Sequence, residues 1–559
     1  MRTLAVLNKA SIEYNPELRH DMNFDPKLHF RPNREGGKGR RKQEEANHFW
    51  SVLKDQLDQF VTDRETFNKV HPRGDDWCLP ALLKEVKEII LTLASQQDHD
   101  LLEGGLNVKL LMSQFYNGVI DMEKQVAWLA DVLKSYCAPM RDEWVDEMYQ
   151  EVCNGNQNND MGEVVKGLRN LLGILEAMKL DVANHHIRCL RPVLIEHTVD
   201  FEQQFFEMKI AAGKLDISAA KTWYDAAVRN YSGFAPYEEN TVAAEMAAFF
   251  EGLCQLIMPS TDSGQVPETF LFDKERLAKL RSDMLDAINI EICMRYHEDL
   301  ERASRIRTIA SCFGVPAPVP PYVAEADREF KKQSGSDFNF DSPSSQPASN
   351  GSSLRNSEFL CPQPQATNLD DGSRTRSIYN CFLALLHTAP ATSNPSQRWE
   401  ALAKPSAIQI SRYTNMPQDV LSLFEAKLTR SLCNPSDERH REVEGQFLTR
   451  LRTELAKRVR EFKDLSGVDL FYAATGGRTP GPGRTWGGPP AEGPSERGVL
   501  QSTVREARVQ GVLQDIATRL AHLGVLHWRV WAQLAYVDVD VDVDDLVGMG
   551  CQSPRTKDD

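Results

Sequence analysis

The sequence predicts an all-α protein, an irregular multi-helix assembly with disordered insertions and tails. Apolar residues recur every three or four positions in several long stretches, as in helices that bury one face. No stretch combines sustained alternation with β-branched enrichment, so strands are not expected. Gly, Pro and Ser gather in a few tracts, which bury too little apolar surface to offset the entropy of ordering.

Residues 1–42 are predicted to form a disordered basic arm. Its last part, residues 31–42, carries six Lys or Arg against one Glu, together with three glycines. Such a composition favours a solvated, flexible segment over a helix. It fits either a nuclear-localisation patch or a charged tail that keeps the chain in solution.

Residues 43–330 are predicted to form an N-terminal helical domain. An apolar stripe from Leu82 to Leu93 marks one helix, and Asp121 is placed to cap a second that ends before Pro139. A longer pattern from Val164 to Met178 runs on toward Pro192, where the missing amide should kink or stop the helix.

The C-terminal half alternates helical and unfolded segments. We expect a disordered linker at 331–372, followed by the first part of a C-terminal helical domain at 373–473. A Gly/Pro-rich disordered insertion at 474–500, a C-terminal helix at 501–536 and an acidic disordered tail at 537–559 come after it. The insertion and the tail are either genuine disordered segments or errors of the gene model.

Composition excludes several classes of protein. A net charge of −15 argues against binding to phosphate backbones, so no nucleic acid is expected as a partner. The run 243–258 is shorter than the ~20 apolar residues of a membrane-spanning helix, and the apolar stretch Leu4–Leu7 is too short for a signal peptide. Eleven cysteines without a CxxC pair fit reduced thiols in the cytoplasm, the nucleus or both.

No catalytic or cofactor motif is present, and none of a phosphate loop, a GxSxG elbow, an HExxH pair or a kinase signature occurs. Neighbouring His185 and His186 point about 100° apart on a helix and cannot share a metal ion. Asp142 and Glu143 follow Pro139 and are interpreted as the first turn of a helix, where carboxylates complement the dipole. The predictions are therefore no enzyme, no cofactor and no metal.

Ser377 is a possible phosphorylation site. It follows Arg374 and Arg376 and precedes Ile378, beside the expected linker, and basophilic kinases favour such accessible sequences. Chance occurrence is the competing interpretation, because short combinations of Arg and Ser are common in linkers.

Two stretches are more specific than any catalytic motif, CAPMRDEWVDEM at 137–148 and MKLDVANHHIRCLRPVLIEHTVDFEQ at 178–203. Both resemble signatures of the t-complex protein 11 family, with the fungal branch nearest. The resemblance extends over most of 45–310 and more loosely over 373–470 and 505–536. It implies an all-helical protein without established enzymatic activity, linked to protein kinase A signalling: fungal members relieve defects of that pathway, and animal members are associated with sperm function.

The same resemblance selects candidate partner-binding residues, the polar and proline positions of the two signatures: Pro139, Arg141, Asp142, Glu143, Lys179, Asp181, Asn184, His185, Arg191, Pro192 and His197. The competing interpretation is that Arg191 and Asp181 form ion pairs or caps around Pro192 and organise the fold.

Three functions therefore stay open. The first is an adaptor that binds a protein of the cyclic-AMP-dependent kinase pathway through a helical groove. The second is a nuclear regulator with another helical partner, and the third is an enzyme with an unrecognised helical active site.

Overall fold

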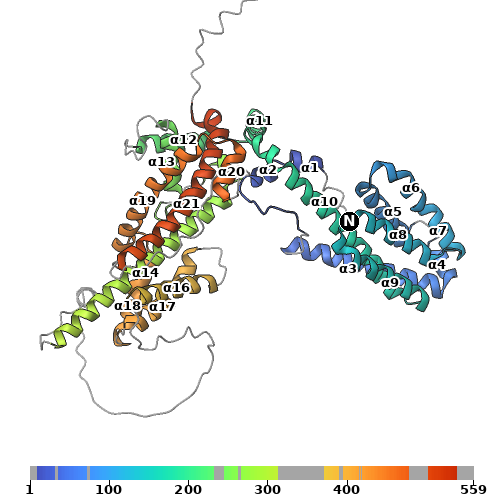
Figure 1. Ribbon diagram of the computed structural model, residues 1–559, viewed down its shortest axis with the longest axis horizontal. Helices are drawn as coiled ribbons and strands as arrows, with labels where there is room; N and C mark the ends of the chain where they lie inside the picture. Colours follow the sequence, from blue (N-terminus) through green and yellow to red (C-terminus); the bar gives the residue numbers. More distant parts are fainter. Residues whose placement is uncertain are drawn as a thin grey trace, which may run out of the picture. The chain divides into compact units, whose positions relative to one another are not determined.

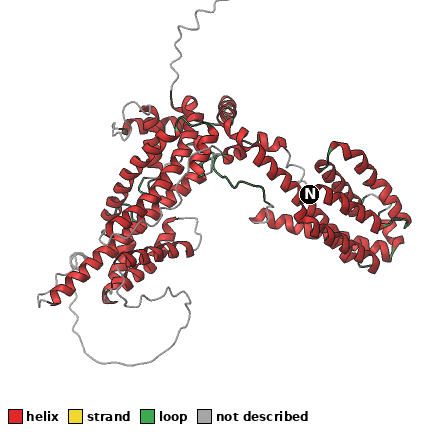
Figure 2. Cartoon of the chain, in the orientation of Figure 1, coloured by secondary structure: helices red, strands yellow, loops and turns green. Residues whose placement is uncertain are grey.

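The computed structural model describes residues 9–31, 36–71, 76–231, 244–261, 266–312, 371–389, 395–414, 416, 418–476 and 501–537. Every regular element in these ranges is a helix (Figure 1, Figure 2), so the predicted all-α, multi-helix fold is confirmed. The contacts divide the chain into two compact units, Met1–Thr198 (unit 1) and Val199–Asp559 (unit 2).

The described part of unit 1 consists of helices and two 3-10 turns. In chain order these are α1 (Lys9–Tyr14), α2 (Pro16–Met22), α3 (Gly36–Thr62), α4 (Arg64–Val70), α5 (Cys78–Leu93), η1 (Gln96–Asp98), α6 (His99–Gly105), α7 (Val108–Asn117), α8 (Met122–Tyr136), η2 (Pro139–Arg141), α9 (Asp142–Asn158) and α10 (Met161–Glu196).

Local signals in the sequence set several of these boundaries. Helix α5 carries the predicted apolar stripe, and Leu82, Val86 and Ile90 on it are buried. Helix α8 begins after Asp121, whose Oδ1 accepts a hydrogen bond from the Lys124 amide at 3.1 Å. The helix then ends at Tyr136, before Pro139, as the sequence predicts.

Helices α9 and α10 pack side by side and form the spine of the unit 1 core. A Cβ atom on Gly167 would lie 2.4 Å from Cγ2 of Val152, closer than packed carbons approach. The absence of a side chain at Gly167 is therefore what allows this close crossing of the two helices.

Helix α10 passes through Pro192 and ends at Glu196. Pro192 therefore does not stop the helix, which was one of the two outcomes the sequence left open. Proline removes a single backbone donor, the helical partner of the Arg188 carbonyl, and the residues after it can still donate to their own i−4 carbonyls.

Within the expected disordered arm at 1–42, the structure places helices α1 and α2 and the first turns of α3. Helix α2 has a side-chain cap at Asn15 and a proline at its first position, a start signal that the composition argument overlooked. Ile12 and Met22 are completely buried. The basic residues Arg40 and Arg41 lie on the exposed first turns of α3, whose later turns bury apolar side chains in the core.

Unit 2 is described by a second set of helices. These are α11 (Thr198–Ala211), α12 (Ser218–Asn230), α13 (Ala244–Ile257), η3 (Glu268–Phe270), α14 (Lys274–Cys312), α16 (Asp371–Thr388), α17 (Pro395–Thr414), α18 (Gln418–Cys433), α19 (Glu438–Phe462), α20 (Gly467–Thr475), α21 (Gln501–Trp531) and the π-helical turn η4 (Ala532–Tyr536). Helix α11 begins at the last residue of unit 1.

The long helices α14, α19 and α21 pack together along unit 2 (Figure 1), and α13 joins them at one end. There Phe249, Phe270 and His527 form an aromatic cluster. The ring centroids of Phe270 and His527 are 3.9 Å apart. Tyr536 closes the cluster, because its hydroxyl lies 2.9 Å from both Thr269 Oγ1 and His527 Nε2.

The division at Thr198 falls inside the expected domain 43–330, and unit 2 joins residues on both sides of the expected linker. The physical reason is that α14 packs against α17, α19 and α21, contacts that local periodicity does not reveal. Most residues of the three segments expected to be disordered lie outside the described residues. This holds for the linker 331–372 except for its last two residues, the insertion 474–500 except for its first three, and the tail 537–559 except for Val537.

Candidate functional site

The first signature stretch forms the entrance to α9. Pro139 opens the turn η2, and Asp142 and Glu143 occupy the first turn of α9, as the sequence predicts. Asp142 also lies near the preceding loop, where its Oδ1 is 3.7 Å from Cys137 Sγ. Pro139 and Glu143 are exposed.

An ion pair connects the two signature stretches. Arg141 donates from Nε to Asp181 Oδ2 at 2.8 Å, and its NH2 atom lies 2.6 Å from the same oxygen. The side chain of Asp181 is 46% exposed, so water screens the pair. The predicted structural role of Asp181 in an ion pair agrees with this contact, although its partner is Arg141.

Lys179 lies two residues before Asp181 on α10 and is buried. Burial lowers the pKa of its ammonium group, and the nearby Glu85 carboxylate opposes that shift. Lys179 therefore faces the interior of unit 1, in contrast to a residue that would meet a partner protein.

Asn184 binds the main chain of the N-terminal segment. Its Oδ1 accepts from the Phe30 amide at 2.6 Å, and its Nδ2 donates to the Phe30 carbonyl at 3.2 Å. One side-chain amide thus satisfies both backbone groups of a single residue, as a neighbouring strand would.

Arg191 holds the same segment through carbonyl groups. Its NH1 donates to the Asp25 carbonyl at 2.6 Å, and its NH2 lies 3.4 Å from the Leu28 carbonyl. Pro192 beside it is exposed. The prediction that Arg191 organises the fold around Pro192 agrees with these contacts, which fasten the chain's own N-terminal residues.

The end of α10 is closed by Arg19 of α2. Its NH2 group donates to the carbonyls of His197 at 3.1 Å and Leu194 at 3.4 Å, so a buried cation satisfies the last carbonyls of the helix. The side chain of His197 is exposed.

His185 lies on the exposed face of α10, with its Nε2 3.3 Å from Cys189 Sγ. In the described ranges no group of three or more His, Cys, Asp or Glu side chains is placed to hold a metal ion. None of the helices described there combines the length and apolar character needed to cross a membrane.

Ser377 lies within α16, in its second turn, and is half-buried. Thr375 and Ile378 on either side of it are buried. A helical, half-buried serine is less accessible to a kinase than the linker setting that the sequence suggested, and its phosphorylation stays a prediction.

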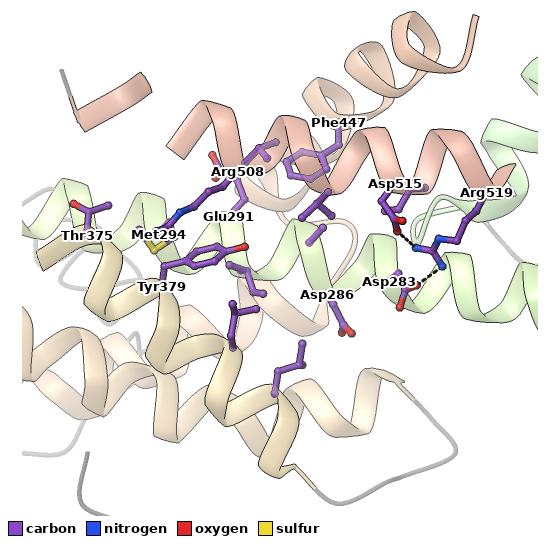
Figure 3. A pocket seen from close by; sticks show the side chains of 17 residues that line it. Asp283, Asp286, Glu291, Met294, Thr375, Tyr379, Phe447, Arg508, Asp515 and Arg519 are labelled. Carbon is purple, nitrogen blue, oxygen red and sulfur yellow. Dashed lines mark hydrogen bonds and ion pairs between the residues drawn. The ribbon is translucent and has the colours of Figure 1, made fainter. Parts of the chain in front are cut away.

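Unit 2 contains a cleft of about 280 Å³ between α14, α16 and α21, which Phe447 of α19 also lines (Figure 3). We call it the unit 2 cleft. Its apolar walls are formed by Ala287, Ile290, Met294, Tyr379, Leu383, Leu386, Val509, Val512 and Ile516.

The carboxylates at the unit 2 cleft are tied to arginines. Arg398 donates to both oxygens of Asp286 at 2.5 and 2.6 Å, and Trp399 Nε1 donates to Oδ1 at 2.7 Å. Burial raises the pKa of the Asp286 carboxyl, while these donors pull it down. Figure 3 shows Arg519 between two other carboxylates, those of Asp283 and Asp515.

Arg508 differs from these arginines. Its guanidinium carbon lies 4.5 Å from the centre of the Tyr379 ring, a cation–π contact between α21 and α16. The side chain thus lies against an aromatic wall of the cleft, next to the apolar surface (Figure 3).

Sequence reasoning found the polar residues of α10 but not what they bind, because their partners lie in a segment expected to be disordered. It also missed the unit 2 cleft, because the lining residues of α14, α16 and α21 are separated by more than 60 residues of sequence. For the N-terminal segment the sequence did contain a signal, since Asn15 followed by Pro16 and Glu17 is typical of a helix start.

Comparison with known proteins agrees with the resemblance seen in the two signatures. The profile of the family described as T-complex protein 11 matches residues 18–540. Protein SOK1 of Saccharomyces cerevisiae is 30% identical over 309 residues, which cover 54% of the chain and 33% of that protein.

Two human proteins are more distant. T-complex protein 11 homolog is 25% identical over 268 residues, covering 44% of the chain and 49% of that protein. T-complex protein 11-like X-linked protein 1 is 23% identical over 303 residues, covering 50% of the chain and 55% of that protein. The chain thus spans between a third and just over half of the length of these relatives. No solved structure matches.

Proposed function

The chain belongs to the T-complex protein 11 family, and from this premise we propose that it is a non-catalytic regulatory adaptor of cyclic-AMP-dependent protein kinase signalling. Family membership and the likeness to Protein SOK1 support a regulatory protein. The kinase pathway, its proteins as direct partners, and a location in the cytoplasm, the nucleus or both are the finer parts of the proposal.

The observation that carries an adaptor role is the unit 2 cleft. Helical adaptors bind partners by receiving apolar side chains of an amphipathic helix between their own helices. Three helices line the cleft with aliphatic and aromatic side chains, and its volume of about 280 Å³ is suited to a few side chains of a partner.

The chemistry of the cleft favours binding over catalysis. Its four carboxylates are all paired with arginines, which is typical of a structural role; they are Asp283, Asp286, Glu291 and Asp515. The described residues that line it include no histidine or cysteine that could serve as a base or nucleophile.

The test is crosslinked affinity purification of the full chain, with quantitation of kinase-pathway subunits. Leu386→Glu places a charge on the half-buried apolar wall of the cleft and should reduce recovery at least about tenfold, since ~1.4 kcal/mol of lost affinity has that effect. Leu423→Glu is the matched control, because Leu423 is 42% exposed on α18 and does not line the cleft.

Two results would contradict the proposal at different levels. If both variants recover the kinase-pathway subunits equally well, the adaptor role stands but the unit 2 cleft is not its binding site. If repeated purifications of the wild-type chain return no kinase-pathway subunit, and loss of the protein leaves phosphorylation of kinase substrates unchanged, the signalling role itself is wrong.

A further inference from the structure

The N-terminal segment between α2 and α3 lies along α10 without regular structure of its own. We call residues 25–31, DPKLHFR, the strap. Helices α1 and α2 precede it, and we call these two helices the anchor. Strap, anchor and α10 all belong to unit 1.

The anchor and the strap are held by different kinds of contact. In the anchor Ile12 and Met22 are fully buried, and the buried Asn23 that follows α2 donates to the hydroxyl of Thr198 at 3.3 Å. In the strap only Leu28 and Phe30 are half-buried, and the other five residues are exposed. The strap buries little apolar surface, so it can leave α10 while the anchor stays packed.

Recognition of the strap is directed at its main chain. Asn184 pairs with the amide and the carbonyl of Phe30, and Arg191 binds the carbonyls of Asp25 and Leu28. All four contacts go to backbone groups, and the two carbonyls that Arg191 binds lie at the two ends of the turn 25–28. Sequence preference is left to the half-buried side chains of Leu28 and Phe30.

The strap begins with a turn, in which the Leu28 amide donates to the Asp25 carbonyl at 3.2 Å. Its His29 ring receives a hydrogen bond from Arg31 Nε at 2.6 Å and contacts the Lys27 carbonyl through Nδ1 at 2.5 Å. These bonds are local to the strap and involve no residue of α10. The segment is thereby preorganised for binding along a helix.

We propose that Asn184 and Arg191 form a binding ledge on α10 for a peptide whose backbone follows that of the strap, with an apolar residue at the Phe30 position. The strap occupies this ledge in cis, and a segment of a partner protein with the same backbone path takes its place. Because a tethered segment has a high effective concentration, commonly in the millimolar range, the strap acts as a built-in competitor. This binding is independent of the kinase-pathway proposal and of the unit 2 cleft.

The experiment measures binding of a fluorescent peptide with the strap sequence DPKLHFR to the full chain by anisotropy. In the wild type the strap competes, and binding should be weak. Phe30→Pro removes the amide donor to Asn184 and should raise affinity for the peptide at least about tenfold, since a lost hydrogen bond to a half-buried group and displacement of the ring both favour release. Adding Asn184→Ala to Phe30→Pro should abolish binding.

Two controls separate main-chain recognition from other effects. Phe30→Ala keeps the amide and should raise affinity less than Phe30→Pro does. His186→Ala alters a ring on α10 that neighbours His185, and it should leave peptide binding of Phe30→Pro unchanged.

Hydrogen exchange reports the state of the strap in the same proteins. Amides of the strap should exchange faster than those of α2 in the wild type, and faster still in Phe30→Pro, while α10 stays protected. The proposal is overturned if the strap exchanges only together with α2, if Phe30→Pro leaves it protected, if the released chain does not bind the peptide, or if Asn184→Ala does not weaken that binding.

Discussion

The signature stretch of α10 and the unit 2 cleft both gather charged side chains, and they differ in what those side chains contact. On α10, Arg141 pairs with Asp181, and Arg191 and Asn184 bind the strap. In the cleft, arginines fix the carboxylates at the margins, and the apolar walls are left open. In this structure the most distinctive sequence contacts other parts of the chain, while ordinary aliphatic residues line the open cleft.

The comparison extends to burial. The carboxylate of Asp286 is 13% exposed and receives three hydrogen bonds, whereas that of Asp181 is 46% exposed and is served by a single arginine. If burial decides how much an ion pair matters, changes at the cleft margin should affect the free energy of unfolding far more than changes at the signature.

The largest effect is expected for Asp286→Ala. It leaves the guanidinium of Arg398 and the indole N–H of Trp399 without their acceptor in a largely buried place. Removing one partner of a buried pair costs about 3–5 kcal/mol. Hydrogen exchange of α14 and α17 in the full chain measures the loss of local stability, with unit 1 peptides as an internal reference.

Asp286→Asn is the matched variant, since the amide oxygen still accepts from Trp399 while the charge is gone. Its loss of stability should be clearly smaller than that of the alanine variant. An alanine variant whose α14 and α17 exchange like the wild type would contradict the structural role given to this carboxylate.

An intermediate effect is expected at His297, buried in α14. Neither ring nitrogen has a hydrogen-bond partner, and the nearest carboxylate oxygen, of Glu301, is 3.9 Å from Nε2. Burial lowers the pKa of the imidazole, and Glu301 and Glu298 oppose that shift. In the unfolded chain the same group titrates near 6.5.

The sign of the pH dependence follows. A base with a lowered folded-state pKa favours folding above the unfolded pKa, and this contribution is lost as the pH falls through the folded pKa. Unit 2 should therefore become less stable as the pH falls below about 6.5. His297→Leu should flatten this part of the profile measured by hydrogen exchange, and an unchanged slope would show that other groups control it.

Much of the fold was accessible from sequence. Helical periodicity predicted α5 and α8, and Asp121 marked a helix start correctly. The division at Thr198 could not be predicted from the sequence, because it depends on α14 packing against helices more than 80 residues away along the chain. At the site, the polarity of Asn184 and Arg191 pointed to contacts, but their partners are backbone groups, which leave no mark in a sequence.

The smallest effect is expected for Arg141→Ala, and it sharpens the comparison most. This pair joins the two signature stretches, so a reading based on distinctive residues alone would assign it great importance. Its partner Asp181 is half exposed to water, where ion pairs contribute about 1 kcal/mol or less. Chemical denaturation of Arg141→Ala, Asp181→Ala and the double variant should yield a coupling free energy below about 1 kcal/mol that shrinks further in high salt. A coupling as large as the loss in Asp286→Ala would mean that burial is not what separates the two regions.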